Sequence, residues 1–326
     1  MKDWRFWLAE QRGTVTAIAI FAFMFLVYGL NHPAGFSANV VQTAANKGVL
    51  LAFVAMAQAL VVITAGIDLS VGMIFTLTNC LASAIVIGSP VQAAAGVVAT
   101  LAVGLACGAA NGLIVIYGRL QPIVATIATG AIYFGLALAI RPTPGGSVEE
   151  TLADALTGRL FDVVPTSLVA LAAVVVVVWI PFSRSAIGRA AYATGSSEAA
   201  AYMSGVPIRR AKFTAYAVAG LLAGIGGLFV TFFTYTGEAA YASGNTYTLF
   251  SIAAVVLGGV SLFGGSGSAI GAIFGALAFR TIGDLLFVFN LDPLWQPLFQ
   301  GVVLLLAVSL GAFGLLRVRN RLDWFG

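Results

Sequence analysis

The chain has 326 residues, of which 60% are hydrophobic and 9% are charged. Soluble domains carry about 25% charged residues, so this composition excludes an ordinary soluble fold and indicates that lipid surrounds most of the chain. The net charge of +4 at pH 7 is therefore interpreted through membrane topology, and it requires no nucleic-acid partner.

Apolar runs recur along the whole chain. Most of them reach about 20 residues, the length that an α-helix needs to cross the hydrocarbon core. They are too long and too continuously apolar for the alternating strands of a membrane barrel. We therefore predict an all-α, polytopic membrane helix bundle of about ten spans, forming a single transmembrane domain over residues 1–326. The predicted spans are residues 14–30, 48–66, 72–88, 91–117, 122–140, 166–182, 211–235, 246–264, 268–289 and 295–316.

The distribution of basic residues predicts the orientation of the bundle. With the N-terminus in the cytoplasm, twelve of the sixteen Lys and Arg residues fall on the cytoplasmic side, as the positive-inside rule requires. Both termini are then cytoplasmic, and residues 141–165, with their acidic stretch, form an external loop. The basic residues assigned to the cytoplasm are Lys2, Arg5, Arg12, Arg119, Arg184, Arg189, Arg209, Arg210, Lys212, Arg317, Arg319 and Arg321.

A polar break with a single carboxylate separates the second and third predicted spans, in the sequence GIDLSVG at residues 66–72. An ionisable group at membrane depth is costly, so Asp68 is a candidate functional residue. The structural interpretation, which the residues alone favour, is that Gly66 ends one helix in the left-handed conformation and that Asp68 or Ser70 caps the next helix.

A second break, LGGVSLFGGSGS at residues 257–268, predicts a helix interruption or tight turn near the cytoplasmic face. The spans divide as five plus five, and an odd number of spans in each half makes the two repeats inverted, as in transporters that build a central site from interrupted helices. No Lys-Ser/Thr pair follows the glycines, so this segment is not a phosphate-binding loop.

Glycine is abundant, with 38 residues. Gly220, Gly224 and Gly227 share one stripe of the seventh span, and Gly271 and Gly275 share one stripe of the ninth. Small residues allow membrane helices to approach closely, so these stripes predict helix crossings that can also act as sliding surfaces.

The chain offers few residues for catalysis or metal binding. It has one histidine, His32, at a membrane exit, and two cysteines, Cys80 and Cys107, within spans. These residues cannot supply a Ser-His-Asp set, a paired-histidine motif or a cysteine cluster. We predict that the chain is not an enzyme and that it holds no metal or cofactor of its own.

Ionisable residues inside the spans are limited to Arg280 and Asp284, four residues apart in one helix. Residues at this spacing face each other, so they are predicted to form a neutral structural pair, with a pathway or gating role as the alternative. A proton- or sodium-coupled carrier would be expected to carry more such groups.

The water-facing segment 183–212 interrupts the apolar pattern. It predicts a short amphipathic helix that begins after Gly195-Ser196-Ser197, with Ser196 or Ser197 as the cap and Glu198 in the first turn. Such a helix suits docking into a groove of a soluble partner. The alternative is an interfacial helix held by anionic lipid.

Three motifs then carry a family resemblance. They are residues 66–72, Glu198-Ala199-Ala200 followed by Ser204-Gly205-Val206, and SIAAVVLGGVSLFGG at residues 251–265. In this order they resemble permease subunits of bacterial ABC sugar importers, of the ribose/xylose/galactose type in the branched-chain amino acid/ribose permease family. Many members carry an acidic residue just before the last motif, where this chain has Thr248-Leu249-Phe250.

The resemblance implies a multi-pass subunit of the bacterial inner membrane. Its implied partners are a second permease subunit, identical or related, a periplasmic sugar-binding protein, and an ABC ATPase subunit that binds ATP and Mg²⁺. It also implies alternating access, driven through a cytoplasmic coupling loop over residues 183–212. The coupling residues would be Ser196, Ser197, Glu198, Ala199, Ala200, Ser204 and Gly205, and the family signature would be Gly66, Asp68, Ser70 and Gly72.

A sugar handed over by a binding protein needs only a weakly polar, aromatic-edged path. For each candidate residue alone, an interhelical hydrogen bond or packing is the simpler interpretation. Two other functions stay open: the same machinery for another small polar solute, such as an amino acid or a signalling furanose, and a secondary carrier or channel. The path candidates are Gln58, Thr64, Asn79, Asn111, Thr126, Tyr133, Asn245 and Phe250.

Overall fold

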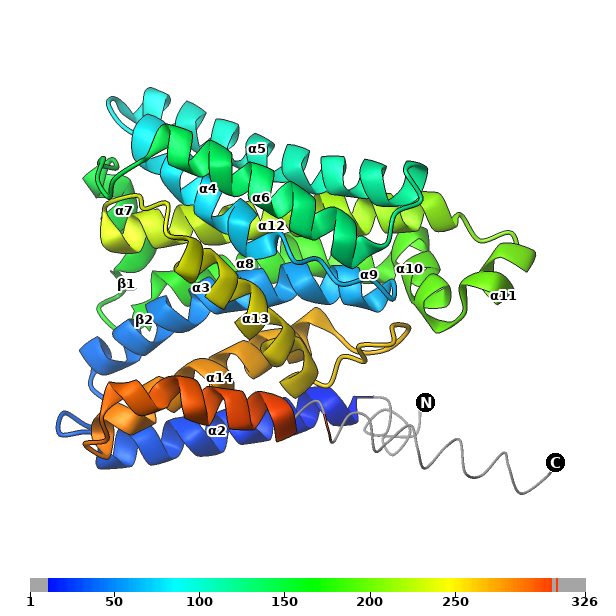
Figure 1. Ribbon diagram of the computed structural model, residues 1–326. Coiled ribbons are helices and arrows are strands. Elements are labelled where there is room, and N and C mark those ends of the chain that lie inside the picture. The colour runs from blue at the N-terminus through cyan, green and yellow to red at the C-terminus, as the bar shows by residue number, and fades with distance from the viewer. Residues whose placement is uncertain (1–10, 307–308, 310–326) are drawn as a thin grey trace, which may run out of the picture.

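The computed structural model describes residues 11–306 and 309, which form a bundle of roughly parallel and antiparallel helices (Figure 1). Within the part of the chain that the structure describes, seven helical segments are long and apolar enough to cross a membrane, and three shorter apolar helices lie among them. The long segments are α2 (Arg12–Asn31), α3 (Ala38–Ile63), α5 (Pro90–Tyr117), α6 (Pro122–Ile140), the continuous run α8–η1–α9 (Thr166–Val174, Val175–Trp179, Ile180–Arg184), α12 (Ile208–Thr234) and α14 (Ala269–Val288). The shorter helices are α4 (Val71–Ile85), α13 (Tyr241–Leu257) and Gln296–Leu306, which follows the 3-10 turn η2 (Pro293–Trp295).

Each of the ten predicted spans coincides with one of these helices, but some boundaries are wrong. Helix α3 begins at Ala38 and not at residue 48. Helix α13 ends at Leu257, whereas the prediction continued to residue 264. Residues 258–264 are apolar enough to resemble a span, but Gly259 and Gly264 adopt positive φ angles, which end the helix. Part of the tenth span and the basic residues Lys2, Arg5, Arg317, Arg319 and Arg321 lie outside the described residues.

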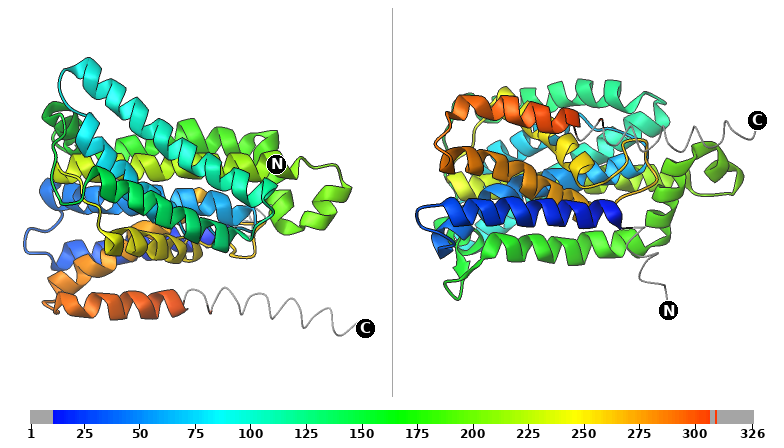
Figure 2. Two further views of the ribbon diagram at one scale, coloured as in Figure 1. Left: turned by 45° about the horizontal axis from the view of Figure 1, so that its top comes forward. Right: turned by 90° about the horizontal axis from the view of Figure 1, so that it is seen from below.

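The smaller elements gather at the two ends of the bundle (Figure 1). Helix α7 (Glu150–Thr157) and the antiparallel pair β1–β2 (Arg159–Leu160, Val164–Pro165) lie at one end, called here the α7 end. Helices α10 (Ala186–Ser196) and α11 (Glu198–Met203) lie at the opposite end, the α11 end, from which α11 projects (Figure 2). The segment 183–212 is therefore mostly helical and not an irregular loop.

Helix α3 forms the centre of the bundle, because 94% of its most apolar 18-residue window is buried by the other helices. Helices α12, α13 and α14 pack on it. The outer helices α2, α5, α6 and α8 keep most of their apolar surface exposed, as expected for helices that face lipid acyl chains.

Glycines set the closest helix crossings. A Cβ atom at Gly108 of α5 would lie 2.3 Å from the carbonyl oxygen of Tyr216 of α12, and one at Gly220 would lie 2.3 Å from that of Gly104. On the neighbouring face of α12, Gly227 fits against Thr78 of α4. The predicted packing role of the glycine stripe in the seventh span is therefore confirmed.

The second predicted stripe packs in the same way. A Cβ atom at Gly271 of α14 would lie 2.2 Å from the carbonyl oxygen of Gly258, and one at Gly275 would lie 2.1 Å from that of Ala254 on α13. The α13–α14 contact therefore depends on backbone atoms in near contact, which any larger side chain would separate.

Candidate coupling segment and buried junction

Helix α11 is a short, capped and exposed element. It begins where the sequence predicts: Ser197 is its N-cap, with the hydroxyl oxygen 3.3 Å from the backbone N of Ala200, and Glu198 occupies the first turn. Ser196 is not the cap, because it forms the last residue of α10 and its hydroxyl donates to the carbonyl of Tyr192. The exposed fractions of Tyr202 and Met203 are 78% and 88%, so α11 presents apolar side chains to its surroundings.

The end of α11 is equally well defined. Gly205 has φ 71°, its N–H donates to the carbonyl of Tyr202, and the N–H of Val206 donates to the carbonyl of Ala201 at 3.0 Å. These two bonds form a Schellman motif, in which the left-handed position strongly favours glycine. The predicted coupling residue Gly205 thus fixes the direction in which the chain leaves α11.

Two polar contacts hold the coupling segment against the bundle. The Lys212 ammonium of α12 lies 2.7 Å from the Glu198 carboxylate, which ties α11 to the start of α12. The Tyr192 hydroxyl of α10 donates to the carbonyl of Gly267 at 2.7 Å. Burial raises the pKa of Tyr192 to about 12, so the hydroxyl keeps its proton, and this bond, to a higher pH than an ordinary tyrosine would.

A tight junction connects α10 to the centre of the bundle. The N–H of Gly265 donates to the carbonyl of Ile63 at the end of α3, at 3.0 Å. A Cβ atom at Gly195 of α10 would lie 1.9 Å from the same carbonyl oxygen and 2.5 Å from the N atom of Gly265. Helix α10 and the glycine-rich segment 258–268 therefore both contact the end of α3, so a shift of α10 should move the end of α3.

A buried polar network surrounds Asp68, in the connection between α3 and α4. Its Oδ1 accepts hydrogen bonds from the N–H of Ser70 at 2.8 Å and from the Ser70 hydroxyl at 2.7 Å. Asn111 of α5 donates to Asp68 Oδ2 at 3.3 Å and to Ser70 Oγ at 2.7 Å, and the Tyr133 hydroxyl of α6 donates toward Asn111 Oδ1 at 3.0 Å. The network joins the α3–α4 junction to α5 and α6.

The predicted capping arrangement at this junction is wrong in detail. The residue in the left-handed conformation is Ala65, with φ 61°, and not Gly66. Gly66 instead provides room for Tyr216, whose hydroxyl oxygen would lie 2.9 Å from a Cβ atom there. Ser70 is the N-cap of α4 but its side chain makes no capping bond, because Asp68 and Asn111 occupy it.

The structure separates the path candidates into groups. Asn111, Thr126 and Tyr133 gather around the Asp68 junction, where the Thr126 hydroxyl accepts from the N–H of Leu69. Asn79 instead joins α4 to α12 near the α7 end, through a 2.8 Å bond to Thr231. The remaining four share no common site: Thr64 bonds to the carbonyl of Val61, Gln58 is buried without a hydrogen-bond partner among the described residues, Phe250 packs on Phe279, and Asn245 is exposed on α13.

Comparison with known proteins decides the family. The model of the family described as branched-chain amino acid transport system/permease component matches residues 40–308. The chain belongs to this permease family.

The permease resembles several bacterial import proteins over most of their length. It is 37% identical to a probable ABC transporter permease protein y4mJ of Sinorhizobium fredii over 85% of this chain and 81% of the relative. It is 33% identical to the ribose import permease protein RbsC of Escherichia coli over 93% of both chains. It is 32% identical to the autoinducer 2 import system permease protein LsrC of Yersinia pseudotuberculosis, over 89% of this chain and 82% of the relative. No solved structure matches the permease.

Two polar contacts of the permease were not predicted from the sequence. The hydroxyl of Thr248 on α13 accepts a hydrogen bond from the N–H of Gly72 at 3.1 Å. Although this chain lacks the acidic residue that many family members carry just before the motif at residues 251–265, Thr248 still provides an acceptor for the signature segment at residues 66–72. Near the α7 end, the Arg141 guanidinium donates to the hydroxyl and carbonyl of Ser83 at 3.0 and 2.7 Å. Neither contact can be read from sequence, because the partners are far apart along the chain.

The two ionisable residues of α14 differ from the prediction. The Asp284 carboxylate lies 4.0 Å from the ammonium of Lys47 on α3. Among the described residues, no hydrogen bond and no ion pair of 4.0 Å or less joins Arg280 to Asp284. An intrahelical neutral pair is therefore not formed. Lys47 lies nine residues after the start of α3, so this helix carries it into the bundle.

Proposed function

We propose that this permease is the membrane-spanning translocation subunit of an ATP-driven, binding-protein-dependent importer of a monosaccharide. The observation that carries the proposal is α11, a capped, exposed helix at one end of the bundle whose supporting helix α10 contacts the end of the central helix α3. The chain's place among permeases of ABC importers, and relatives whose names include ribose import, support the substrate class.

The proposed mechanism is alternating access driven from a partner ATPase subunit, which binds ATP and Mg²⁺. The exposed Tyr202 and Met203 of α11 would fill a groove of that subunit, as an amphipathic helix does in many complexes. When the ATPase pair closes, α10 would move with α11, and the glycine contacts among Gly195, Gly265 and Ile63 would pass the shift to α3 and the Asp68 junction.

Two short helices in corresponding positions of the two halves support the proposed inverted repeat. In each half of the chain the third spanning helix is short, α4 with 15 residues and α13 with 17. The two helices contact each other where the N–H of Gly72 donates to Thr248. Short helices in corresponding positions of two halves are typical of transporters whose path lies between the repeats.

The α7 end is the proposed docking face for a periplasmic binding protein. The α11 end would face the cytoplasm, as the basic residues of segment 183–212 require. At the α7 end, hydrogen bonds from the Thr151 hydroxyl and the N–H of Leu152 lower the pKa of Glu149, so this exposed carboxylate stays charged near neutral pH. The face would thus offer fixed negative charge to a partner.

A specific observation supports one alternative substrate. The similarity to a permease whose name includes autoinducer 2 import favours a signalling furanose as the second candidate. The machinery would be the same, and only the ligand of the binding protein would differ.

The test is solute uptake into liposomes that contain the permease with its ATPase subunit, ATP inside and the binding protein outside. Radiolabelled ribose, a branched-chain amino acid and a furanose signal are compared at equal concentration. Our account predicts ATP-dependent uptake of ribose. Uptake that needs no ATPase but follows an imposed proton or sodium gradient would show a secondary carrier and contradict the proposal.

A further inference from the structure

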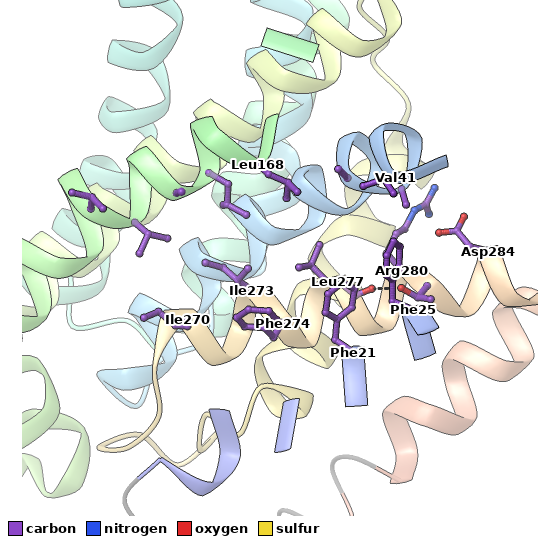
Figure 3. Close-up of a pocket in the computed structure, with 17 residues that line it drawn as sticks. Phe21, Phe25, Val41, Leu168, Ile270, Ile273, Phe274, Leu277, Arg280 and Asp284 are labelled. Atoms are coloured by element: carbon purple, nitrogen blue, oxygen red, sulfur yellow. Dashed lines mark hydrogen bonds between the residues drawn. The ribbon is translucent and has the colours of Figure 1, made fainter. Parts of the chain in front are cut away.

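A groove of about 560 Å³ opens between α2 and α8 and is backed by α3 and α14. Figure 3 shows Ile270, Ile273, Phe274 and Leu277 of α14 along it, with Leu168 facing them from α8. Of its seventeen lining residues, Arg280, Thr281 and Asp284 are the polar ones, and all three lie toward one end. The groove is therefore an apolar trough with a polar end.

The groove is long enough to cross one leaflet of a bilayer. From Ile270 to Asp284 the helix α14 advances fourteen residues, which is about 21 Å at 1.5 Å per residue. One leaflet of the hydrocarbon core is about 15 Å deep, half of a core about 30 Å thick. An extended acyl chain thus fits along the groove.

The polar end continues into a second cavity of about 380 Å³ toward the α7 end. Arg280 and Asp284 line both cavities. The second cavity is also lined by His32, which directly follows α2, and by Asn39 and Lys47 in the first half of α3. The polar second cavity could thus hold a lipid headgroup near the membrane surface, and the apolar groove could hold an acyl chain at membrane depth.

The charges at the polar end are not balanced. Lys47 and Asp284 face each other at 4.0 Å, and Figure 3 shows Arg280 beside Asp284. Within the described residues the Arg280 guanidinium makes no hydrogen bond and no ion pair within 4.0 Å. Two cations against one carboxylate leave one positive charge at membrane depth, where unpaired charge is costly and marks a binding site.

We propose that the α2–α8 groove binds an anionic glycerophospholipid with one negative charge, its phosphate at Arg280 and Lys47 and one acyl chain along α14. A guanidinium donates two parallel hydrogen bonds to a phosphate, which the free Arg280 can do. A singly charged lipid such as phosphatidylglycerol neutralises the site, whereas phosphatidylethanolamine brings an ammonium group of its own.

The test measures lipid bound to the full-length permease, purified in mild detergent, by native mass spectrometry. Phosphatidylglycerol and phosphatidylethanolamine are each titrated against the wild type and five variants, the fifth being Arg280→Lys. Arg280→Gln removes the charge, with Arg159→Gln outside both cavities as its control. Ala172→Phe fills the groove, and Ala173→Phe, on the neighbouring exposed position of α8 that does not line it, is the matched control.

We expect one phosphatidylglycerol per chain, with affinity lowered about tenfold by Arg280→Gln through loss of a charge-assisted contact. Ala172→Phe should also lower retention, and both controls should leave it unchanged. Arg280→Lys keeps the charge and should recover part of the affinity, which separates lipid binding from a general folding defect. Equal binding of both lipids, or equal retention by Arg280→Gln and its control, would overturn the proposal. So would a dimer that Ala172→Phe disrupts with no change in bound lipid.

Discussion

At the scale of single residues, Asp68 explains why a carboxylate is tolerated at membrane depth. It is fully buried and accepts three hydrogen bonds, two from Ser70 and one from Asn111. Buried polar groups are stable only when they are hydrogen-bonded, so the donors of Ser70 and Asn111 depend on this acceptor as much as it depends on them.

Replacing Asp68 with Ala should therefore destabilise the permease. The substitution leaves buried donors of Ser70 without their acceptor, at a cost of about 1–3 kcal/mol for each group left unsatisfied. We expect a lower thermal unfolding midpoint in detergent than for the wild type. Glu238→Ala, which removes an exposed carboxylate, is the control. An unchanged midpoint in Asp68→Ala would show that the network does not support the α3–α4 junction.

The sequence identified Asp68 as a costly residue but not its partners. Asn111 is 43 residues away, and its amide was one of several candidates for a sugar path. Hydropathy and spacing show that a polar residue lies in a span, but they do not show which other span it faces. The same limit explains Arg280 and Asp284, whose spacing within one helix suggested a pair while the actual neighbour, Lys47, belongs to α3.

At the scale of elements, the contact between α5 and α12 depends on the absence of side chains. Gly104 and Gly108 meet Gly220 and Tyr216 with backbone atoms in near contact. Lipid gives little hydrophobic drive between membrane helices, so close van der Waals packing must supply the stability.

Gly108→Val should separate these two helices. Its Cβ atom would lie 2.3 Å from the carbonyl oxygen of Tyr216, a backbone atom that cannot move aside cheaply. Overpacking of this kind costs about 1–3 kcal/mol or more. We expect a lower unfolding midpoint and a smaller monodisperse fraction in size-exclusion chromatography. The control is Gly301→Val, where no atom lies within 4 Å of the new Cβ; equal behaviour of the two variants would contradict the account.

Helix positions were predictable because apolar length is a strong signal, and ends such as those of α6 were predicted as well, whereas the start of α3 and the end of α13 were not. The glycine-rich segment 258–268 shows the reason. Its residues are apolar enough to extend a span, but positive φ angles at Gly259, Gly264, Gly265 and Gly267 turn the chain back so that Gly265 contacts both α10 and the end of α3. These contacts depend on the tertiary structure and cannot be inferred from composition.

At the scale of the whole molecule, the proposed route of coupling runs from one exposed helix to the centre of the bundle. It starts at α11, passes along α10 to the contacts of Gly195 with Ile63 and Gly265, and reaches the Asp68 junction through the end of α3. The direction of α11 depends on its C-terminal cap at Gly205. A change of that cap should therefore weaken coupling and leave the span helices intact.

The most direct test is the number of sugar molecules imported per ATP hydrolysed in liposomes containing the permease, its ATPase subunit and the binding protein. Gly205→Val is compared with Gly135→Val, because neither new Cβ meets an atom within 4 Å but only Gly205 has a positive φ, of 71°. We predict that Gly205→Val still inserts and that the complex hydrolyses ATP while importing several-fold fewer sugar molecules per ATP, with Gly135→Val close to wild type. The same transport ratio in Gly205→Val and wild type would contradict the assignment of α11 as the coupling helix.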